Sequence, residues 1–189
     1  GKPIVVPDEV VAVHLRDLHE ASIPGTLPGA TDFAAWTRQI DKIDHIRDED
    51  LWRVHEASRA HLVRTARGNL ERAGMKRNAS FEELASLRNV LDKDALTIGF
   101  ARRFATYKRA TLILSDLERL KKILLNPARP VQIIFAGKAH PADGDGKHLV
   151  QRIAEFTKDP AIRSRVIFLE NYNMRIARRL VRGVDVWLN

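Results

Sequence analysis

The sequence predicts an α/β fold in which a parallel sheet follows a mainly helical segment. Two observations predict it. Apolar residues recur at three- and four-residue spacing up to about residue 92, and short apolar runs then alternate with amphipathic stretches. Four strands alternating with three helices form a βαβαβαβ series, which is typical of a parallel, doubly wound sheet. We therefore expect a helical segment over 1–92 and an α/β unit over 93–189 that is incomplete at its C-terminal end.

Two helices are expected in the first half. The acidic residues 48–50 suit a helix N-terminus, and helical spacing then continues to Gly74. Ser80 and Glu83 match a capping box, which predicts that a second helix begins there. The stretch 23–29 is rich in Pro and Gly, so we expect a loop between helices.

The second half is expected to alternate strictly between strands and helices. Each predicted strand is a short apolar run, and each predicted helix is amphipathic. The expected strands are 95–100, 131–136, 165–169 and 184–188, and the expected helices between them are 110–125, 146–156 and 174–181.

Composition excludes several classes of protein. The chain has 189 residues, no cysteine and a formal charge of +8, so disulfide scaffolds and thiol catalysis are excluded and an anionic partner is indicated. No apolar run is long enough to span a bilayer, and the first residues do not resemble a signal peptide. We expect a cytoplasmic protein without a membrane segment, a metal site or a bound nucleic acid.

The residues that follow the predicted strands carry the candidate chemistry. Ligands of open parallel sheets bind beyond the C-terminal strand ends. Here those positions are 102–109, 137–141 and 170–173, which supply Arg, Lys and His donors, an aromatic ring and a carboxylate. Arginine offers a planar fork and lysine a compact charge, which together suit a phosphate dianion. No G-x-G-x-x-G or Walker motif is present, so dinucleotide and P-loop functions lack their main evidence.

Structural roles remain open for several of these residues. His140 precedes a proline and suits a turn, and Tyr172 suits packing at the domain rim. Glu170 suits the start of the following helix. Asp143 opens an Asp-Gly-Asp-Gly stretch that lacks the ligand ladder of a calcium loop, so a turn and helix cap are expected.

Three motifs, in order, give the sequence a family resemblance. They are Arg102-Arg103-x-x-x-Tyr107-Lys108-Arg109, Gly137-Lys138-Ala139 and the stretch 166–172. Over about 40–189 the chain resembles the α-glucan phosphorylases, in their shorter bacterial and archaeal form. The resemblance implies a Rossmann-like sheet belonging to the C-terminal domain of a GT-B glycosyltransferase that uses pyridoxal 5′-phosphate.

The resemblance also implies roles for individual residues. Arg103 and Lys108 match the catalytic residues that hold the substrate phosphate against the cofactor phosphate. Arg102, Lys108 and Tyr172 match positions that bind the cofactor. The implied reaction is attack of inorganic phosphate on the terminal α-1,4 bond of a glucan, which releases α-glucose 1-phosphate with retention; the cofactor phosphate acts as the proton partner.

The sequence departs from the family pattern at three points. Asn173 stands where many relatives carry Arg, and Ala105 replaces their His, so contacts through those two side chains differ. The family's Gly-Thr-x-x-Met-Lys segment, whose lysine forms the Schiff base, does not occur in the sequence. We therefore expect this chain alone to be inactive and to hold no covalently attached cofactor.

Three alternative functions remain open from the sequence. A nucleotide-sugar-dependent GT-B glycosyltransferase would also use an Arg-x-x-x-x-Lys pair, here Arg103 and Lys108. A basic nucleic-acid-binding module would draw on the four arginines within 175–182, although those positions also suit a solvated helix face. The helical first half could instead serve as the interface of a homo-oligomer.

Overall fold

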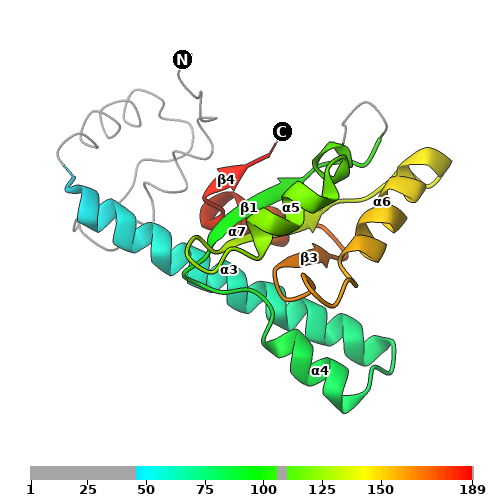
Figure 1. Ribbon diagram of the computed structural model, residues 1–189, viewed down its shortest axis with the longest axis horizontal. Coiled ribbons are helices and arrows are strands. Elements are labelled where there is room, and N and C mark those ends of the chain that lie inside the picture. The colour runs from blue at the N-terminus through cyan, green and yellow to red at the C-terminus, as the bar shows by residue number, and fades with distance from the viewer. Residues whose placement is uncertain (1–45, 106–109, 189) are drawn as a thin grey trace. The chain divides into compact units, whose positions relative to one another are not determined.

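A computed structural model describes residues 46–105 and 110–188 of the chain, and Figure 1 traces their elements. The chain divides into two compact units, 1–58 and 59–189. The change of pattern near residue 92 therefore falls inside the second unit. The expected loop at 23–29 lies outside the described residues.

The second unit is built on a four-stranded parallel sheet with the order β3-β2-β1-β4. The strands are β1 (Leu96–Ala101), β2 (Val131–Ala136), β3 (Val166–Leu169) and β4 (Val186–Trp187). β1 and β2 pair in register from Leu96 opposite Val131 to Ala101 opposite Ala136. Strands buried on both faces need apolar side chains at successive positions. The expected α/β fold with a parallel sheet is confirmed.

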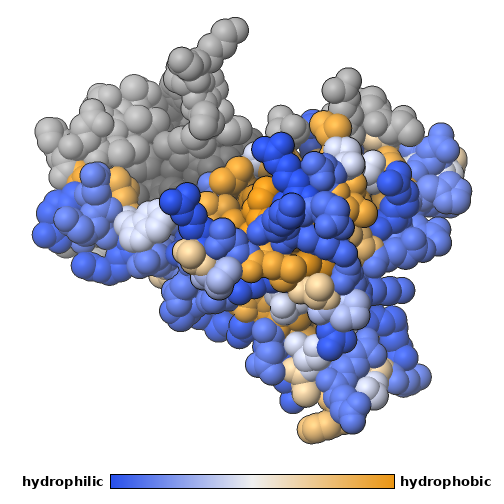
Figure 2. Space-filling model, viewed as in Figure 1, coloured by the Kyte–Doolittle hydropathy of each residue, from blue (hydrophilic) through white to orange (hydrophobic). Residues whose placement is uncertain are grey.

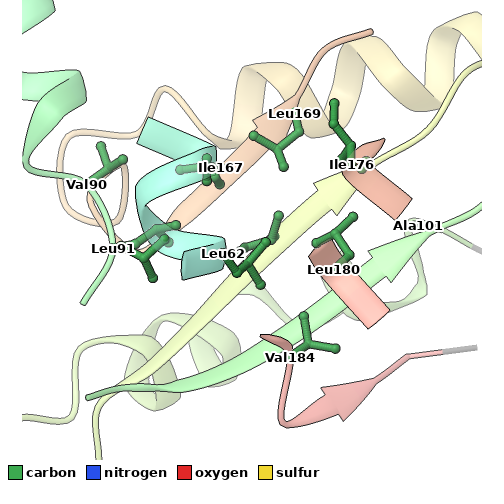
Figure 3. Packing of buried hydrophobic residues seen from close by; sticks show 13 residues of the cluster. Leu62, Val90, Leu91, Ala101, Ile167, Leu169, Ile176, Leu180 and Val184 are labelled. Carbon is green, nitrogen blue, oxygen red and sulfur yellow. The ribbon is translucent and has the colours of Figure 1, made fainter. Parts of the chain in front are cut away.

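Helices cover both faces of this sheet. The helical elements are α3 (Asp48–Lys76), α4 (Phe81–Arg88), the 3₁₀ turn η3 (Leu112–Leu114), α5 (Leu117–Leu124), α6 (Gly144–Phe156) and α7 (Met174–Gly183). On one face, side chains from α3 and α7 join Ile167 and Leu169 of β3 in one buried cluster (Figure 3). On the other face, α5 and α6 pack on Ile133 and Phe135 of β2 in a second cluster. The chain crosses the sheet in one direction from β1 to β3 and in the other from β3 to β4, so right-handed crossovers place α5 and α6 on one face and α7 on the other.

Side-chain caps set where several helices begin. The hydroxyl of Ser80 accepts a hydrogen bond from the backbone N–H of Glu83, 3.1 Å away, so α4 begins where the sequence predicts. Asp143 caps α6 through the N–H of Gly146, and Asn173 caps α7 through the N–H of Ile176. Each bond satisfies an N–H that the first helical turn leaves without an intrahelical partner.

Two predicted elements are shorter in the structure. A single helix over 110–125 is wrong: the segment contains η3 and then α5, because Asp116 accepts from the N–H of Arg119 and starts a new helix. The predicted strand at 184–188 contracts to β4. Val184 instead packs against the backbone of Gly99, where an added Cβ would come within 2.7 Å of the valine side chain.

A buried ion pair fastens α3 to the start of β4. Nη1 of Arg59 donates to the carboxylate of Asp185 at 2.6 Å, and the two side chains are only 6% and 12% exposed. The other carboxylate oxygen of Asp185 accepts from the N–H of Thr97 in β1. The ε nitrogen of Arg59 also donates to the backbone carbonyl of Lys93. One carboxylate therefore joins three segments that are distant in the sequence.

Replacing Asp185 by Asn is expected to lower the free energy of unfolding by about 3 kcal/mol. The amide keeps the shape of the side chain but removes the negative charge that faces the buried guanidinium of Arg59. Urea denaturation of the 189-residue chain measures the change. An Asp94→Asn substitution, in an exposed ion pair with Lys93, is the matched control. Equal effects of the two substitutions would contradict the role given to Asp185.

The surface of the second unit combines polar helices with an apolar area. In Figure 2 polar side chains cover α3 and α4, and apolar side chains gather in the middle of this face, where Figure 1 places β4 and α5. The exposed apolar residues of these two elements include Leu117 and Ile123 of α5 and Trp187 of β4. None of the helices formed by the described residues is both long and apolar enough to cross a membrane.

Candidate functional site

The segments that follow β1 and β2 run side by side at the C-terminal edge of the sheet. The backbone N–H of Phe104 donates to the carbonyl of Lys138 at 3.0 Å, and Phe104 and Ala139 form a parallel bridge beyond the strand ends. We call residues 102–105 and 137–139 the rim segments. Their pairing extends the sheet ladder past the regular strands, so the side chains of both segments emerge at one edge.

Gly137 allows the two rim segments to approach closely. Its φ of +147° lies where L side chains are rarely found, and an added Cβ would collide with the carbonyl oxygen of Arg102. The same Cβ would lie 2.7 Å from the ring of Phe104. Glycine is therefore required here by both backbone conformation and space, which is the physical reason for the Gly-Lys-Ala motif.

Phe104 anchors the first rim segment in the core. Its ring is fully buried, and the centroid of the ring lies 5.8 Å from the ring centroid of Phe100 and 5.9 Å from that of Phe168. The carbonyl oxygen of Phe104 approaches Gly146 in the first turn of α6 closely. A Cβ atom added to Gly146 would lie 2.5 Å from that oxygen. The anchor holds the preceding arginines beside a helix N-terminus, whose partial positive charge favours anions.

The structure brings together three of the basic residues predicted to act at this edge. Arg102 is half-buried, whereas Arg103 and Lys138 are exposed on the paired rim segments. Lys108, together with Tyr107, lies outside the described residues, so its predicted contact with the same phosphate stays a prediction. Cationic side chains on adjacent parallel segments form a suitable start for a phosphate site.

The segment after β3 contributes a different set of contacts. Glu170 pairs with Arg77, the residue after α3, at 3.1 Å, and Arg77 also lies 3.5 Å from Glu83. The predicted role of Glu170 at a helix start is wrong, because α7 begins only at Met174 and Asn173 is its cap. The sequence could not reveal Arg77 as the partner of Glu170, because the pairing spans 93 positions and no local pattern links the two residues.

Tyr172 lies between the rim and the core. Its ring packs against the cluster shared by α3, α7 and the sheet, and burial raises the pKa of its phenol. The preceding Asn171 has a φ of +57°, a left-handed conformation that redirects the chain away from β3. The phenol therefore stays neutral at physiological pH and offers a ring face and a hydroxyl, not a charge.

Two further residues have structural contacts at this edge. Nδ1 of His140 accepts a hydrogen bond from the N–H of Ala142 at 3.2 Å, as a turn residue does. Asp143 caps α6, which confirms the expected turn and cap in place of a calcium loop. Within the described part of the chain, no group of three or more His, Cys, Asp or Glu side chains is placed to hold a metal ion.

His61 of α3 lies close to arginines of α3 and α7. Burial lowers the pKa of His61, and the guanidinium groups of Arg179, Arg64, Arg175 and Arg182 lower it further. The sequence places Arg175, Arg179 and Arg182 on one helix but gives no sign that His61 of another helix lies near them. Because four cations act on one imidazole, protonation of that imidazole is unfavourable in the folded protein.

We expect acidification from pH 7.5 to 5.5 to destabilise the wild-type chain more than a His61→Gln variant. The folded-state pKa of His61 lies below its ordinary value of 6.5. The unfolded chain therefore binds more protons as the pH falls through about 6.5, and the free energy of unfolding decreases. Thermal denaturation at several pH values measures the difference. Equal loss of Tm in both proteins would contradict the assignment.

Comparison with known proteins supplies the family. Residues 41–187 match the family model of the carbohydrate phosphorylases. The chain is 48% identical over 147 residues to glycogen phosphorylase of Aquifex aeolicus, which covers 78% of this chain and 21% of that protein. It is 47% identical over 151 residues to maltodextrin phosphorylase of Thermococcus litoralis, covering 78% of this chain and 17% of that protein.

A third relative agrees with the first two. Glycogen phosphorylase of Mycobacterium tuberculosis is 42% identical over 164 residues, which covers 80% of this chain and 19% of that protein. The chain thus spans about a fifth of the length of these curated relatives. The matched stretch includes all four strands and both rim segments. On this evidence the chain belongs to the carbohydrate phosphorylase family.

Proposed function

We propose that this chain forms the phosphate-binding edge of an enzyme that phosphorolyses terminal α-1,4-glucan bonds to α-glucose 1-phosphate. The main structural support is the hydrogen bond from the N–H of Phe104 to the carbonyl of Lys138, which holds the two basic rim segments side by side. Relatives named glycogen and maltodextrin phosphorylase support the choice of reaction and of glucan as substrate. Inorganic phosphate is the second substrate.

The donors at this edge fit pyridoxal 5′-phosphate as the cofactor. Arg102 and Arg103 offer guanidinium N–H groups for phosphate oxygens, and Tyr172 offers a half-buried ring beside which an aromatic cofactor ring can pack. A cofactor lysine motif of the Gly-Thr-x-x-Met-Lys form is absent from this sequence. When bound, the cofactor would supply a phosphate group that exchanges a proton with the substrate phosphate.

The chain's own residues would act by positioning and by charge. Two phosphate groups held close together repel each other, and the guanidinium of Arg103 with the ammonium of Lys108 offsets that repulsion. Arg102 neutralises charge on the cofactor side. Because Phe104 is anchored in the core, the backbone that carries Arg102 and Arg103 is fixed before the substrate arrives, so little reorganisation is needed there.

A chimera tests the proposal in a complete enzyme. Residues 41–187 replace the matching stretch of the Aquifex aeolicus glycogen phosphorylase, and release of glucose 1-phosphate from a maltodextrin is measured with inorganic phosphate. We expect phosphorolysis within about tenfold of the parent enzyme. A folded chimera that carries the cofactor but has no activity would overturn the proposal, as would glucosyl transfer from a nucleotide sugar without phosphorolysis.

A further inference from the structure

A pocket lies at the opposite end of the sheet from the rim segments. It has a volume of about 490 Å³ and is bounded by α3, by the connection that leads into β1 and by the connection that leads into β3. Its described lining residues are Ala60, Val63, Arg64, Arg67, Asn89, Leu91, Asp92, Lys93, Ser164 and Arg165. We call it the opposite-edge pocket. Among the described residues, none of those assigned to phosphorolysis lines it.

Hydrogen bonds to backbone atoms fix the walls of this pocket. The N–H of Leu91 donates to the carbonyl of Ser164 at 2.7 Å and thereby joins the two connections. The guanidinium of Arg67 donates to the carbonyls of Val90 at 2.8 Å and Leu91 at 2.9 Å. The hydrogen-bond partners of Arg67 in the described part of the chain are thus backbone carbonyls, which do not neutralise its charge. The pocket is therefore held open by rigid structure and carries a fixed positive charge.

Cations outnumber carboxylates around the opposite-edge pocket. Arg64, Arg67, Lys93 and Arg165 line it, against the single carboxylate of Asp92. Lys93 pairs with Asp94 at 2.8 Å, so its charge is partly offset. The other three guanidinium groups come from two separate parts of the chain, α3 and the residue before β3. Fields of one sign concentrate in such concave surfaces and attract small ions of the opposite sign.

Arg165 provides the most specific observation. Its Nη1 atom is buried and has no hydrogen-bond partner among the described residues. A buried guanidinium N–H group without an acceptor destabilises the folded protein, because its hydrogen bond to water is lost and no other hydrogen bond replaces it. The pocket is therefore lined by a guanidinium whose hydrogen-bonding capacity the described residues do not fill.

We propose that the opposite-edge pocket binds a small phosphate monoester with a hydroxylated body. The three guanidinium groups suit the phosphate oxygens. Asn89, Ser164 and Asp92 offer groups that hydrogen-bond to hydroxyls, and the volume lies in the range of small-molecule sites. The site is distinct from the rim segments, so a phosphorylated metabolite bound here would leave the phosphorolytic edge unoccupied.

Glycerol 2-phosphate is the probe, and the 189-residue chain is the protein. We expect saturating glycerol 2-phosphate to raise Tm by about 5 °C, whereas glycerol at equal concentration leaves it unchanged. In ¹⁵N NMR spectra the amides of Leu91, Lys93 and Ser164 should shift during the titration. Shifts confined to the rim segments, or no shifts at all, would overturn the proposal.

Charge-removing variants assign the effect to the pocket. Arg165→Gln is expected to weaken binding by about tenfold or more, because a charge-assisted hydrogen bond is lost. Arg163→Gln removes the same charge two residues away, outside the pocket, and should bind as the wild type does. Equal affinities of these two variants would refute the assignment. If Arg165→Gln does not fold, the exposed Arg64→Gln decides by the same comparison.

A further variant distinguishes the proposal for the pocket from the proposal for the rim segments. Arg103→Gln should retain the response of Leu91 and Ser164 to glycerol 2-phosphate, because Arg103 lies at the other end of β1. Loss of that response in Arg103→Gln would overturn the pocket proposal without affecting the proposal for the rim. If the chimera is inactive, the proposed function fails, but the glycerol 2-phosphate titration of the 189-residue chain still tests the pocket independently.

Discussion

Replacing Arg103 by Ala in the chimera is expected to lower kcat/KM for phosphorolysis by about 10²- to 10³-fold. Removal of one preorganised donor to a developing anionic centre has an effect of this size, which corresponds to about 3–4 kcal/mol in the transition state. The next residue, Phe104, is fully buried, so the arginine stands on backbone that does not rearrange to compensate. Initial rates at varied phosphate concentration measure the change.

A matched control separates this effect from general loss of charge. Arg129 is exposed and lies just before β2, at the opposite edge of the same sheet. Arg129→Ala removes the same charge and should leave kcat/KM within about twofold, since distant exposed charges are largely screened. If Arg103→Ala were as active as Arg129→Ala, Arg103 would have no part in the phosphate site.

Replacing Gly137 by Ala is expected to lower the free energy of unfolding by about 4 kcal/mol. Two effects contribute, each of about 1–3 kcal/mol. The added methyl group overpacks against the backbone of Arg102 and the ring of Phe104, and alanine is strained at a positive φ. Because the obstacle is partly backbone, it cannot move aside as a flexible side chain would. Urea denaturation of the 189-residue chain measures the loss.

Gly144 offers the matched control for this substitution. It begins α6, and an added Cβ there meets no heavy atom within 4 Å. Gly144→Ala should therefore leave stability unchanged or raise it slightly, since alanine loses less conformational freedom in a helix than glycine does. A Gly137→Ala variant as stable as Gly144→Ala would contradict the close pairing of the rim segments. A folded Gly137→Ala chimera should also bind phosphate more weakly.

Local patterns in the sequence were sufficient to predict most of the fold. The apolar runs that became β1, β2 and β3 were predicted to within a residue at each end, because buried parallel strands leave a continuous apolar signal. The caps at Ser80 and Asp143 are also predictable from local sequence, because a helix cap involves residues only three positions apart. The break between η3 and α5 was missed because the leucine spacing continues through it, whereas Asp116 stops the helix.

Contacts between distant residues could not be predicted in the same way. The motifs placed Arg102, Arg103 and Lys138 at one edge, and the structure brings their segments together. The ion pair of Arg59 with Asp185 joins residues 126 positions apart, and nothing in either local pattern signals it. The same holds for the opposite-edge pocket, whose walls come from α3 and two connections. Such features depend on the packing of helices against the sheet.

One titration tests the central claim most directly. Inorganic phosphate is added to the isotope-labelled 189-residue chain, and the backbone and side-chain NMR signals of Arg103 and Lys108 are followed together with the amides of 137–139. We expect all of these signals to shift with one common Kd that rises with salt concentration. Signals of Arg103 and Lys108 that respond with different Kd values, or a response of only one of them, would show that these cations do not hold the same anion.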